Sequence, residues 1–284
     1  MRMKPFLAWL IPLCLTSCLP LETGWTLPAA KDSRIVLQGY LHAADSVHRI
    51  WGAYARSDGA VEAADLPMEI RVNGQDVAVT TPEPSPFPDL LPALYVFEAR
   101  LQEGDRIRVK AGDASAEATV LPPPDTVSVT MNERPAGENG SRTLSFTVQL
   151  KGSGYYRMEL LPENRWFSAD GRLLRVSYPE GPSVLFSMEA GTVGKTLSMP
   201  GPQRADMETL PDAAKMECRV MVRVLSLSRD RFAWYNAWDS DRTDGFFSGF
   251  ADPVRFPGNV AGGTGLVDIA GETGRTFSVG TFSK

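Results

Sequence analysis

The sequence predicts an all-β protein of two β-sandwich modules, each of immunoglobulin-like type, with one short helix near the C-terminus. Apolar and polar residues alternate in short segments such as 68–72 and 143–150, and a period of two is typical of strands with one buried face. The 25 glycines and 22 prolines are spread along the chain, as expected for many turns between short strands. Three consecutive prolines at 122–124 favour a stiff boundary between an N-terminal module at 34–123 and a C-terminal domain at 124–284.

The N-terminal module is expected to begin with a strand at 34–41, which is rich in β-forming residues. A later strand at 68–72 ends in Asn73-Gly74. This pair favours a type I′ hairpin turn, because both central residues of such a turn need positive φ. A strand at 114–120 is expected to complete the module.

The C-terminal domain is expected to contain strands at 126–131, 143–150, 154–160, 184–188 and 215–227. Ser228 follows the last of these and is a good N-cap residue, so a helix over 229–238 is predicted. This helix is short and aromatic, and tertiary packing has to stabilise it. Gly262, Gly263 and Gly265 indicate a turn with positive φ before a last apolar strand.

Composition excludes some classes of function. The net charge is -5 and no segment is rich in lysine or arginine, which argues against nucleic-acid binding because that needs a basic surface. Cys218 is the one cysteine outside the first eighteen residues and lies in an alternating apolar segment. It is expected to be buried, because free cysteine packs as a small hydrophobic residue.

The first residues have the three parts of an export signal. Arg2 and Lys4 precede an apolar segment at 6–15, and Leu15-Thr16-Ser17-Cys18 follows. An apolar residue, two small residues and a cysteine in this order resemble the lipobox of bacterial lipoproteins. The alternative is an ordinary secretory signal in which the cysteine has no role.

The lipobox resemblance implies that residues 1–17 are removed and that Cys18 receives palmitate-type acyl chains. Two or three such chains hold a protein on a membrane. Leu19, where an aspartate would act as a retention signal, implies sorting to the outer membrane. Residues 18–33 would then form a tether, stiffened by prolines and loosened by a glycine.

Three segments of the mature chain, taken with the lipobox, carry a second resemblance. They are Val36-Leu37-Gln38-Gly39-Tyr40, Gly154-Tyr155-Tyr156-Arg157, and Phe250-Ala251-Asp252-Pro253-Val254 followed by the glycine-rich residues 258–267. In this order they resemble outer-membrane lipoproteins of unknown function that are often encoded beside TonB-dependent receptors. The resemblance implies an accessory role beside such a receptor and implies no catalytic residues. The chain departs from the family at Val267-Asp268, where an aromatic residue is frequent.

The acidic segment 239–245 has the composition of a calcium loop without its spacing. Counted from Asp239 as in an EF-hand, position 5 is Thr243, the glycine falls at position 7 and position 12 is Phe250. We therefore expect a solvated acidic loop, with a calcium site of another kind as the alternative.

Aromatic residues crowd the same region: Trp234, Tyr235, Trp238, Phe246, Phe247 and Phe250. Most are expected to pack in a core, because aromatic side chains dominate core energetics. Trp238 and Phe247 lie in sequence beside the acidic segment, so with Asp239 and Asp241 they are the candidate residues for an exposed ligand-binding surface.

The motifs of common enzymes are absent from the sequence, which has no Gly-x-Ser-x-Gly, His-Glu-x-x-His or Cys-x-x-Cys. His42 and His48 flank Asp45 in one segment, and a structural role is expected for them rather than a metal site. We therefore expect a non-enzymatic, lipid-anchored envelope protein without cofactor or metal. The family resemblance implies that it is an accessory or ligand-capturing partner of an outer-membrane TonB-dependent transporter. The alternatives are a glycan-binding or adhesive surface module and a hydrolase with paired carboxylates.

Overall fold

The computed structural model describes residues 34–55, 61–62, 66–80, 83–84, 93–134, 142–243 and 257–284. Cys18, with the predicted signal and tether, and Phe247 lie outside the described residues. The protein consists mostly of β-strands, as predicted, and these strands form two sheets that contain nearly all of the described regular structure. The strands are β1 (Arg34–His42), β2 (Val47–Ala55), β3 (Val61–Glu62), β4 (Met68–Val72), β5 (Gln75–Val77), β6 (Glu83–Pro84), β7 (Ala93–Glu98), β8 (Arg106–Ala111), β9 (Ala114–Thr119), β10 (Asp125–Arg134), β11 (Thr143–Phe167), β12 (Leu173–Ser177), β13 (Ser183–Pro200), β14 (Lys215–Leu227) and β15 (Thr264–Ser283).

Within the described residues two helices accompany the strands, α2 (Arg204–Glu208) and α3 (Arg229–Thr243). The prediction of a single helix was therefore wrong. Helix α2 is one short turn whose start is fixed locally, because the backbone N–H of Gln203 donates to Asp206 Oδ2 at 2.8 Å. Hydrophobic periodicity gives no signal for so short a helix. Neither of these helices is long and apolar enough to cross a membrane, within the described part of the chain.

The N-terminal half is built from two sheets around one core. Strands β2, β7 and β6 continue from β1 in the larger sheet, and β5-β4-β8-β9 form the smaller antiparallel sheet. Side chains of both sheets meet in a single cluster that includes Leu37, Ile50, Phe97, Ile107 and Val109. The predicted Asn73-Gly74 turn is confirmed, since both residues have positive φ and join β4 to β5.

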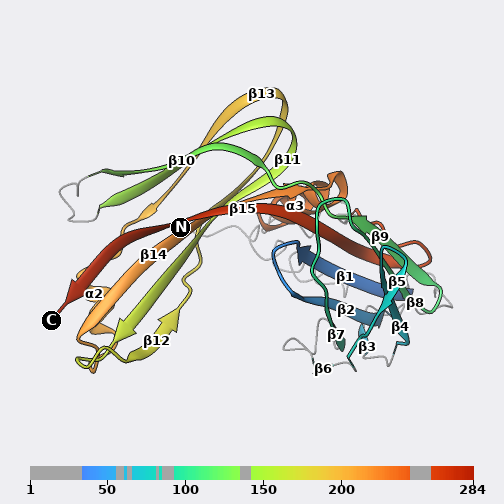
Figure 1. Ribbon diagram of the computed structural model, residues 1–284, viewed down its shortest axis with the longest axis horizontal. Helices are drawn as coiled ribbons and strands as arrows, with labels where there is room; N and C mark the ends of the chain where they lie inside the picture. Colours follow the sequence, from blue (N-terminus) through green and yellow to red (C-terminus); the bar gives the residue numbers. More distant parts are fainter. Residues whose placement is uncertain are drawn as a thin grey trace, which may run out of the picture.

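Strand β15 connects the two halves of the molecule. Residues 264–270 run parallel to β1, with Val36 opposite Thr264, and residues 271–283 then pair antiparallel with β14. Figure 1 shows β15 in red running from one lobe into the other. Residues 264–270, which were predicted to belong to the C-terminal domain, thus complete the sheet of the N-terminal half. Eleven strands form this one continuous sheet as a result.

The C-terminal half depends on a bend in β11. The two strands predicted at 143–150 and 154–160 are one 25-residue strand, whose register shifts between Gly152 and Gly154. Both glycines have positive φ (120° and 145°), a conformation that favours glycine and marks sharp bends in strands. Before the bend β11 pairs with β10, and after it with β14. Apolar side chains of the two arms, such as Phe146 and Met158, share one core.

The predicted turn in the glycine cluster is confirmed, with φ of 71° at Gly262 and 114° at Gly265. A Cβ at Gly265 would lie 2.0 Å from the carbonyl oxygen of Leu37 in β1. Glycine at this position therefore permits the parallel contact that begins the pairing of β15 with β1.

We predict that Gly265→Ala lowers the free energy of unfolding by at least about 2 kcal/mol, because it adds both a steric clash and a strained φ. Urea unfolding followed by tryptophan fluorescence measures this change. Gly194→Ala is the matched control, since a Cβ at Gly194 meets nothing within 4 Å, and it should change stability by no more than about 0.5 kcal/mol. Equal effects of the two substitutions would contradict the role assigned to Gly265.

Candidate functional site

Helix α3 begins where the sequence predicts and continues beyond the predicted end. The hydroxyl oxygen of Ser228 accepts a hydrogen bond from the N–H of Arg231 at 3.1 Å, which caps the helix. The helix extends from 229 to 243, so Asp239 and Asp241 lie in its last turns and not in the acidic loop that was expected. The reason is that no glycine or proline interrupts the chain between Ser228 and Gly245.

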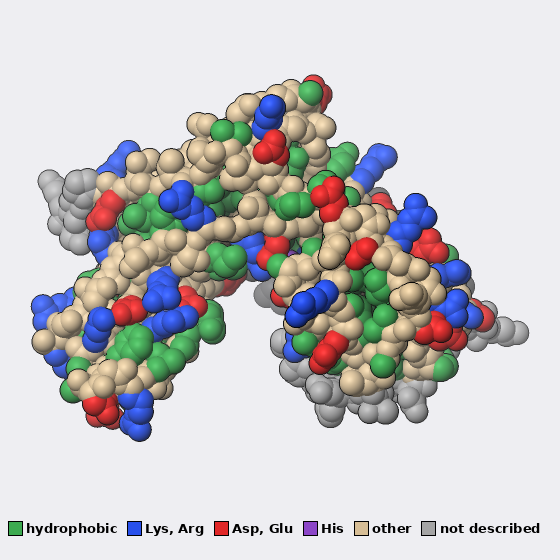
Figure 2. All heavy atoms as spheres, viewed as in Figure 1, with side chains coloured by type: hydrophobic (Ala, Val, Ile, Leu, Met, Phe, Trp, Pro, Cys, Tyr) green, Lys and Arg blue, Asp and Glu red, His purple; other side chains and the backbone are tan. Residues whose placement is uncertain are grey.

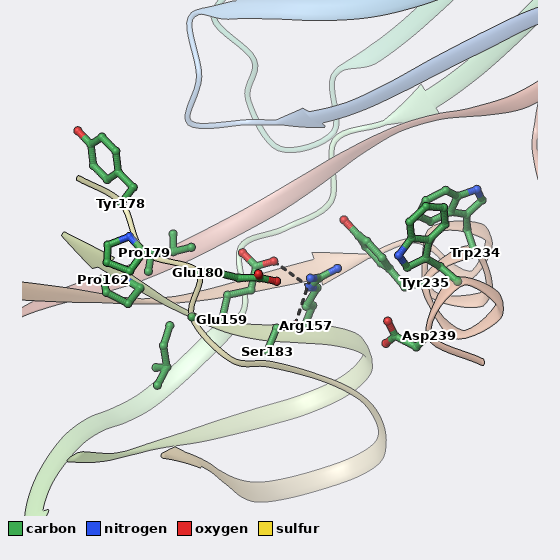
Figure 3. Close-up of a pocket in the computed structure, with 14 residues that line it drawn as sticks. Arg157, Glu159, Pro162, Tyr178, Pro179, Glu180, Ser183, Trp234, Tyr235 and Asp239 are labelled. Atoms are coloured by element: carbon green, nitrogen blue, oxygen red, sulfur yellow. Dashed lines mark hydrogen bonds and ion pairs between the residues drawn. The ribbon is translucent and has the colours of Figure 1, made fainter. Parts of the chain in front are cut away.

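A groove of about 650 Å³ lies between α3 and the segment that joins β12 to β13. One wall carries Trp234, Tyr235, Trp238 and Asp239 from α3, and the other carries Tyr178, Pro179 and Glu180. Figure 3 shows Arg157 and Glu159 of β11 between the two walls. The volume is in the range of small-molecule sites.

The α3 wall presents stacked aromatic rings. Trp234 and Trp238 lie one helical turn apart with ring centroids 5.4 Å apart and an interplanar angle of 11°. Trp238 is 44% exposed, whereas Trp234 and Tyr235 are half-buried. On the opposite wall, Tyr178 is 73% exposed. Trp238 was named from the sequence as a candidate for an exposed binding surface, and it does lie at the surface. Asp239 lines the same groove.

The floor of the groove is an ion-pair network. Glu159 Oε1 lies 2.8 Å from Arg157 Nε, and Glu159 Oε2 accepts hydrogen bonds from Arg223 at 3.0 and 2.7 Å. The Arg157 guanidinium also lies 4.2 Å from the ring centre of Tyr235 and donates to the Ser183 hydroxyl at 3.1 Å. These contacts hold Arg157 and Glu159 in fixed orientations at the base of the groove.

Helix α3, which follows β14 of the C-terminal half, is anchored to the N-terminal half by a buried arginine. The Arg231 side chain is 1% exposed, and its Nη1 donates to the carbonyl oxygen of Leu41 in β1 at 3.1 Å. The same nitrogen lies 3.9 Å from Asp268 Oδ2 in β15. Burial raises the pKa of the Asp268 carboxyl above its ordinary value, and the charge of Arg231 acts in the opposite direction.

An aromatic contact also joins α3 to the N-terminal half, since the ring centroids of Trp234 and Tyr40 are 5.0 Å apart. On another side of the helix, the ring centroids of Phe232 and of Tyr155 in β11 are 4.8 Å apart. In the Gly154-Tyr155-Tyr156-Arg157 segment, successive side chains thus point to opposite faces of the strand. Tyr155 and Arg157 face the helix, and Tyr156 packs beside Phe186 in the core.

The histidines and the cysteine have structural contacts. His42 Nδ1 lies 3.1 Å from Glu272 Oε2, and this contact lowers the pKa of Glu272. His48 is 1% exposed, with Nε2 3.0 Å from the carbonyl oxygen of Ala99. The predicted burial of Cys218 is confirmed at 1% exposure, and burial raises its pKa to about 11. No group of three or more metal-ligating side chains occurs among the residues that the structure describes.

Of the candidate residues named from the sequence, the structure brings Trp238 and Asp239 together at the groove. Asp241 lies in α3 with its side chain outside the described residues, and Cys18 and Phe247 are outside them altogether. The opposite wall, Tyr178 to Glu180, had no signal in the sequence, because it approaches α3 only through tertiary pairing of β11 with β13. The sequence analysis named Arg157 only as part of the Gly154-Tyr155-Tyr156-Arg157 segment of the family resemblance, and not as a site residue.

Comparison with known proteins leaves the chain without an assigned family: no family model and no curated protein matches it. Several solved structures show distant likeness, and the three described next each have a TM-score below 0.25. A putative ApaA protein from Bordetella pertussis scores 0.18 at 15% identity and covers 37% of this chain and 82% of its own. A DUF4785 family protein from Legionella pneumophila scores 0.23 at 10% identity over 68% of this chain and 51% of its own.

The third, a putative β-galactosidase from Bacteroides fragilis, scores 0.20 at 12% identity, and the match covers 87% of this chain. The chain spans about a third of that enzyme's length, since 33% of it is covered. Likenesses at these scores assign neither fold family nor activity.

We predict that Arg231→Met lowers the free energy of unfolding by about 3–5 kcal/mol, because it leaves the Asp268 carboxyl buried without its cation. The double variant Arg231→Met/Asp268→Asn is expected to be more stable than Arg231→Met alone. Urea denaturation of both variants measures the coupling between the two residues.

The control is Arg71→Met, which removes an exposed guanidinium 2.6 Å from Asp76. This variant should unfold at nearly the wild-type urea concentration, because exposed ion pairs stabilise little. Strictly additive effects of the Arg231 and Asp268 substitutions would show that the pair does not anchor α3.

Proposed function

We propose that this protein is a non-enzymatic, lipid-anchored protein of the cell envelope that captures a ligand for an outer-membrane TonB-dependent transporter. The observation that carries the ligand-binding part is the open groove beside α3, where an exposed Trp238 lies near fixed charged groups. The lipobox at Cys18 supports the anchor, and the family resemblance supports the partner. The groove is the proposed ligand site.

The ion pairs of Glu159, at the floor of the groove, support a binding role for this carboxylate over a catalytic one. A glycosidase needs one carboxyl group that gives a proton and a second that acts as base or nucleophile. Both oxygens of Glu159 are instead held by the guanidinium groups of Arg157 and Arg223. Such a carboxylate maintains the shape of the groove and is poorly placed to transfer a proton to a ligand.

We further propose that the two halves are sandwiches of the immunoglobulin-like class. Two facing sheets of short strands around one core support this for the N-terminal half. In the C-terminal half, the bent β11 places two arms on a shared core. The contribution of β15 to both halves is a departure from separate immunoglobulin-like domains.

We predict that Cys18→Ser abolishes incorporation of labelled palmitate and moves the protein out of the detergent phase in a Triton partition assay, because the acylated thiol is lost. Cys14→Ser is a matched control four residues earlier in the same segment, and it should leave labelling intact. Labelling that survives Cys18→Ser, or that requires Cys14, would refute the proposed anchor.

Affinity capture tests the proposed partner. The tagged full-length protein, purified from detergent-solubilised outer membranes after growth under several nutrient limitations, is expected to retain a TonB-dependent β-barrel receptor. The Cys18→Ser variant should retain much less of it, since it would not reach the same membrane. Recovery of no β-barrel partner under any of these conditions would overturn the transport role.

A further inference from the structure

We infer that the groove beside α3 binds a neutral oligosaccharide several sugar units long. This inference rests on the proposed function, because it takes the groove as the ligand site. It adds the chemical class of the ligand and its length, and three features of the groove carry it.

The aromatic walls fit the apolar faces of sugar rings. One face of the Trp238 indole lies against Trp234, while 44% of the side chain stays exposed. Tyr178, on the opposite wall, is 73% exposed. Rigid aromatic rings that stay at the surface are typical contact platforms for ligands with an apolar face, because they lose little conformational entropy on binding.

The charged groups favour hydroxyl groups over ions. Arg157 offers donors only, and Glu159, Glu180 and Asp239 offer acceptors. A sugar hydroxyl both donates and accepts hydrogen bonds, so it can satisfy either kind of group. An anionic ligand would meet three carboxylates, and a cation would meet the Arg157 guanidinium at the floor. The mixture of signs therefore fits a neutral ligand with many hydroxyl groups.

A second hollow adjoins the groove at the edge of β11. It has a volume of about 390 Å³ and shares Pro162, Pro179 and Glu180 with the first. Its walls add the side-chain amides of Asn164 and Gln203, which can each donate and accept hydrogen bonds. A ligand that stacks on Trp238 and also reaches Asn164 has to cross Pro179 and Glu180, where the two hollows meet, and only an oligomer is long enough to do so.

The prolines and aromatic rings could also contact an extended peptide. Peptide recognition relies largely on main-chain hydrogen bonds along a strand edge or on grooves that read prolines. Here the polar groups of the groove are mostly charged side chains fixed by one another, such as Arg157 and Glu159. This favours the saccharide, and a peptide is an outcome that the experiment distinguishes.

The test uses the acylated full-length protein in detergent on an array of β-1,4-glucan, α-1,4-glucan, xylan and chitin oligosaccharides, from disaccharides to hexasaccharides. Sulfated and uronic-acid oligosaccharides and proline-rich peptides are printed beside them. We expect at least one neutral series to bind, with the hexasaccharide tighter than the disaccharide. Titration calorimetry with that hexasaccharide then compares the variants.

Trp238→Ala should weaken hexasaccharide binding by about tenfold or more, the loss typical of a central aromatic contact. Trp238→Phe should restore part of it by retaining a ring. Asn164→Ala should weaken the hexasaccharide and leave the disaccharide unchanged. Leu173→Ala is the matched control, because Leu173 is an exposed apolar side chain (48%) outside both hollows, and it should bind as the wild type does.

Binding to no neutral series, preference for anionic sugars or peptides, or unchanged affinity in Trp238→Ala would each overturn the inference. If the receptor is still captured while every neutral series fails, the choice of ligand is wrong and the transport role stands. If a hexasaccharide binds through Trp238 but no receptor is captured, the sugar site stands and the transport role falls.

Discussion

The structure depends on one strand that belongs to two lobes at once. Strand β15 pairs with β1 through residues 264–270 and with β14 through residues 271–283. The backbone groups of Val267, on the edge of β15 that faces away from β1, also have hydrogen-bond partners. The Asn259 amide donates to the carbonyl oxygen of Val267 at 2.7 Å and accepts from its N–H at 3.0 Å.

The core of the N-terminal half contains Val267 and Ile269, so this core is complete only when the last strand is in place. The two halves therefore fold as coupled units, and the pairing of chain ends gives a high contact order. Figure 2 shows an indentation between the lobes on the face drawn. The pairing of β15 with β1 and with β14 joins the strands of the two lobes into one sheet.

Helix α3 adds a second connection between the lobes. Arg231 reaches the backbone of β1 and the carboxyl group of Asp268 from within the interior. A buried ion pair contributes little net stability compared with apolar packing, but removal of one partner is costly. The pair therefore specifies where α3 docks more than it stabilises the protein. That position matters because the same face of the helix carries Trp234, Tyr235 and Trp238, which form a wall of the groove.

Local chemistry made part of the fold predictable, and non-local pairing made the rest unpredictable. The Asn73-Gly74 turn, strand β14 and the capped start of α3 each follow from a few adjacent residues, and each is confirmed. The parallel pairing of β1 with β15 joins segments from opposite ends of the chain, and nothing in either segment specifies it. The bend of β11 was missed because Gly152 and Gly154 were interpreted as a break between two strands, whereas they change the direction of one strand.

At the candidate site, Trp238 and Asp239 could be named from the aromatic and acidic composition. Tyr178 and Glu180 could not, because their approach to α3 depends on how β11 and β13 pair.

The rigidity of the groove floor follows from the same architecture. Glu159 and Arg157 lie on β11 just after its bend, and Arg223 lies opposite Glu159 on β14. Neighbouring strands fix the spacing of these three side chains, and Tyr235 of α3 covers Arg157 from above. Glu272, paired with His42, also interacts with Arg223 through its charge. A site whose polar groups are already held by one another loses less conformational entropy when a ligand arrives. The position of α3, set by Arg231, and the bend of β11, set by two glycines, are thus the two structural conditions for a preformed groove.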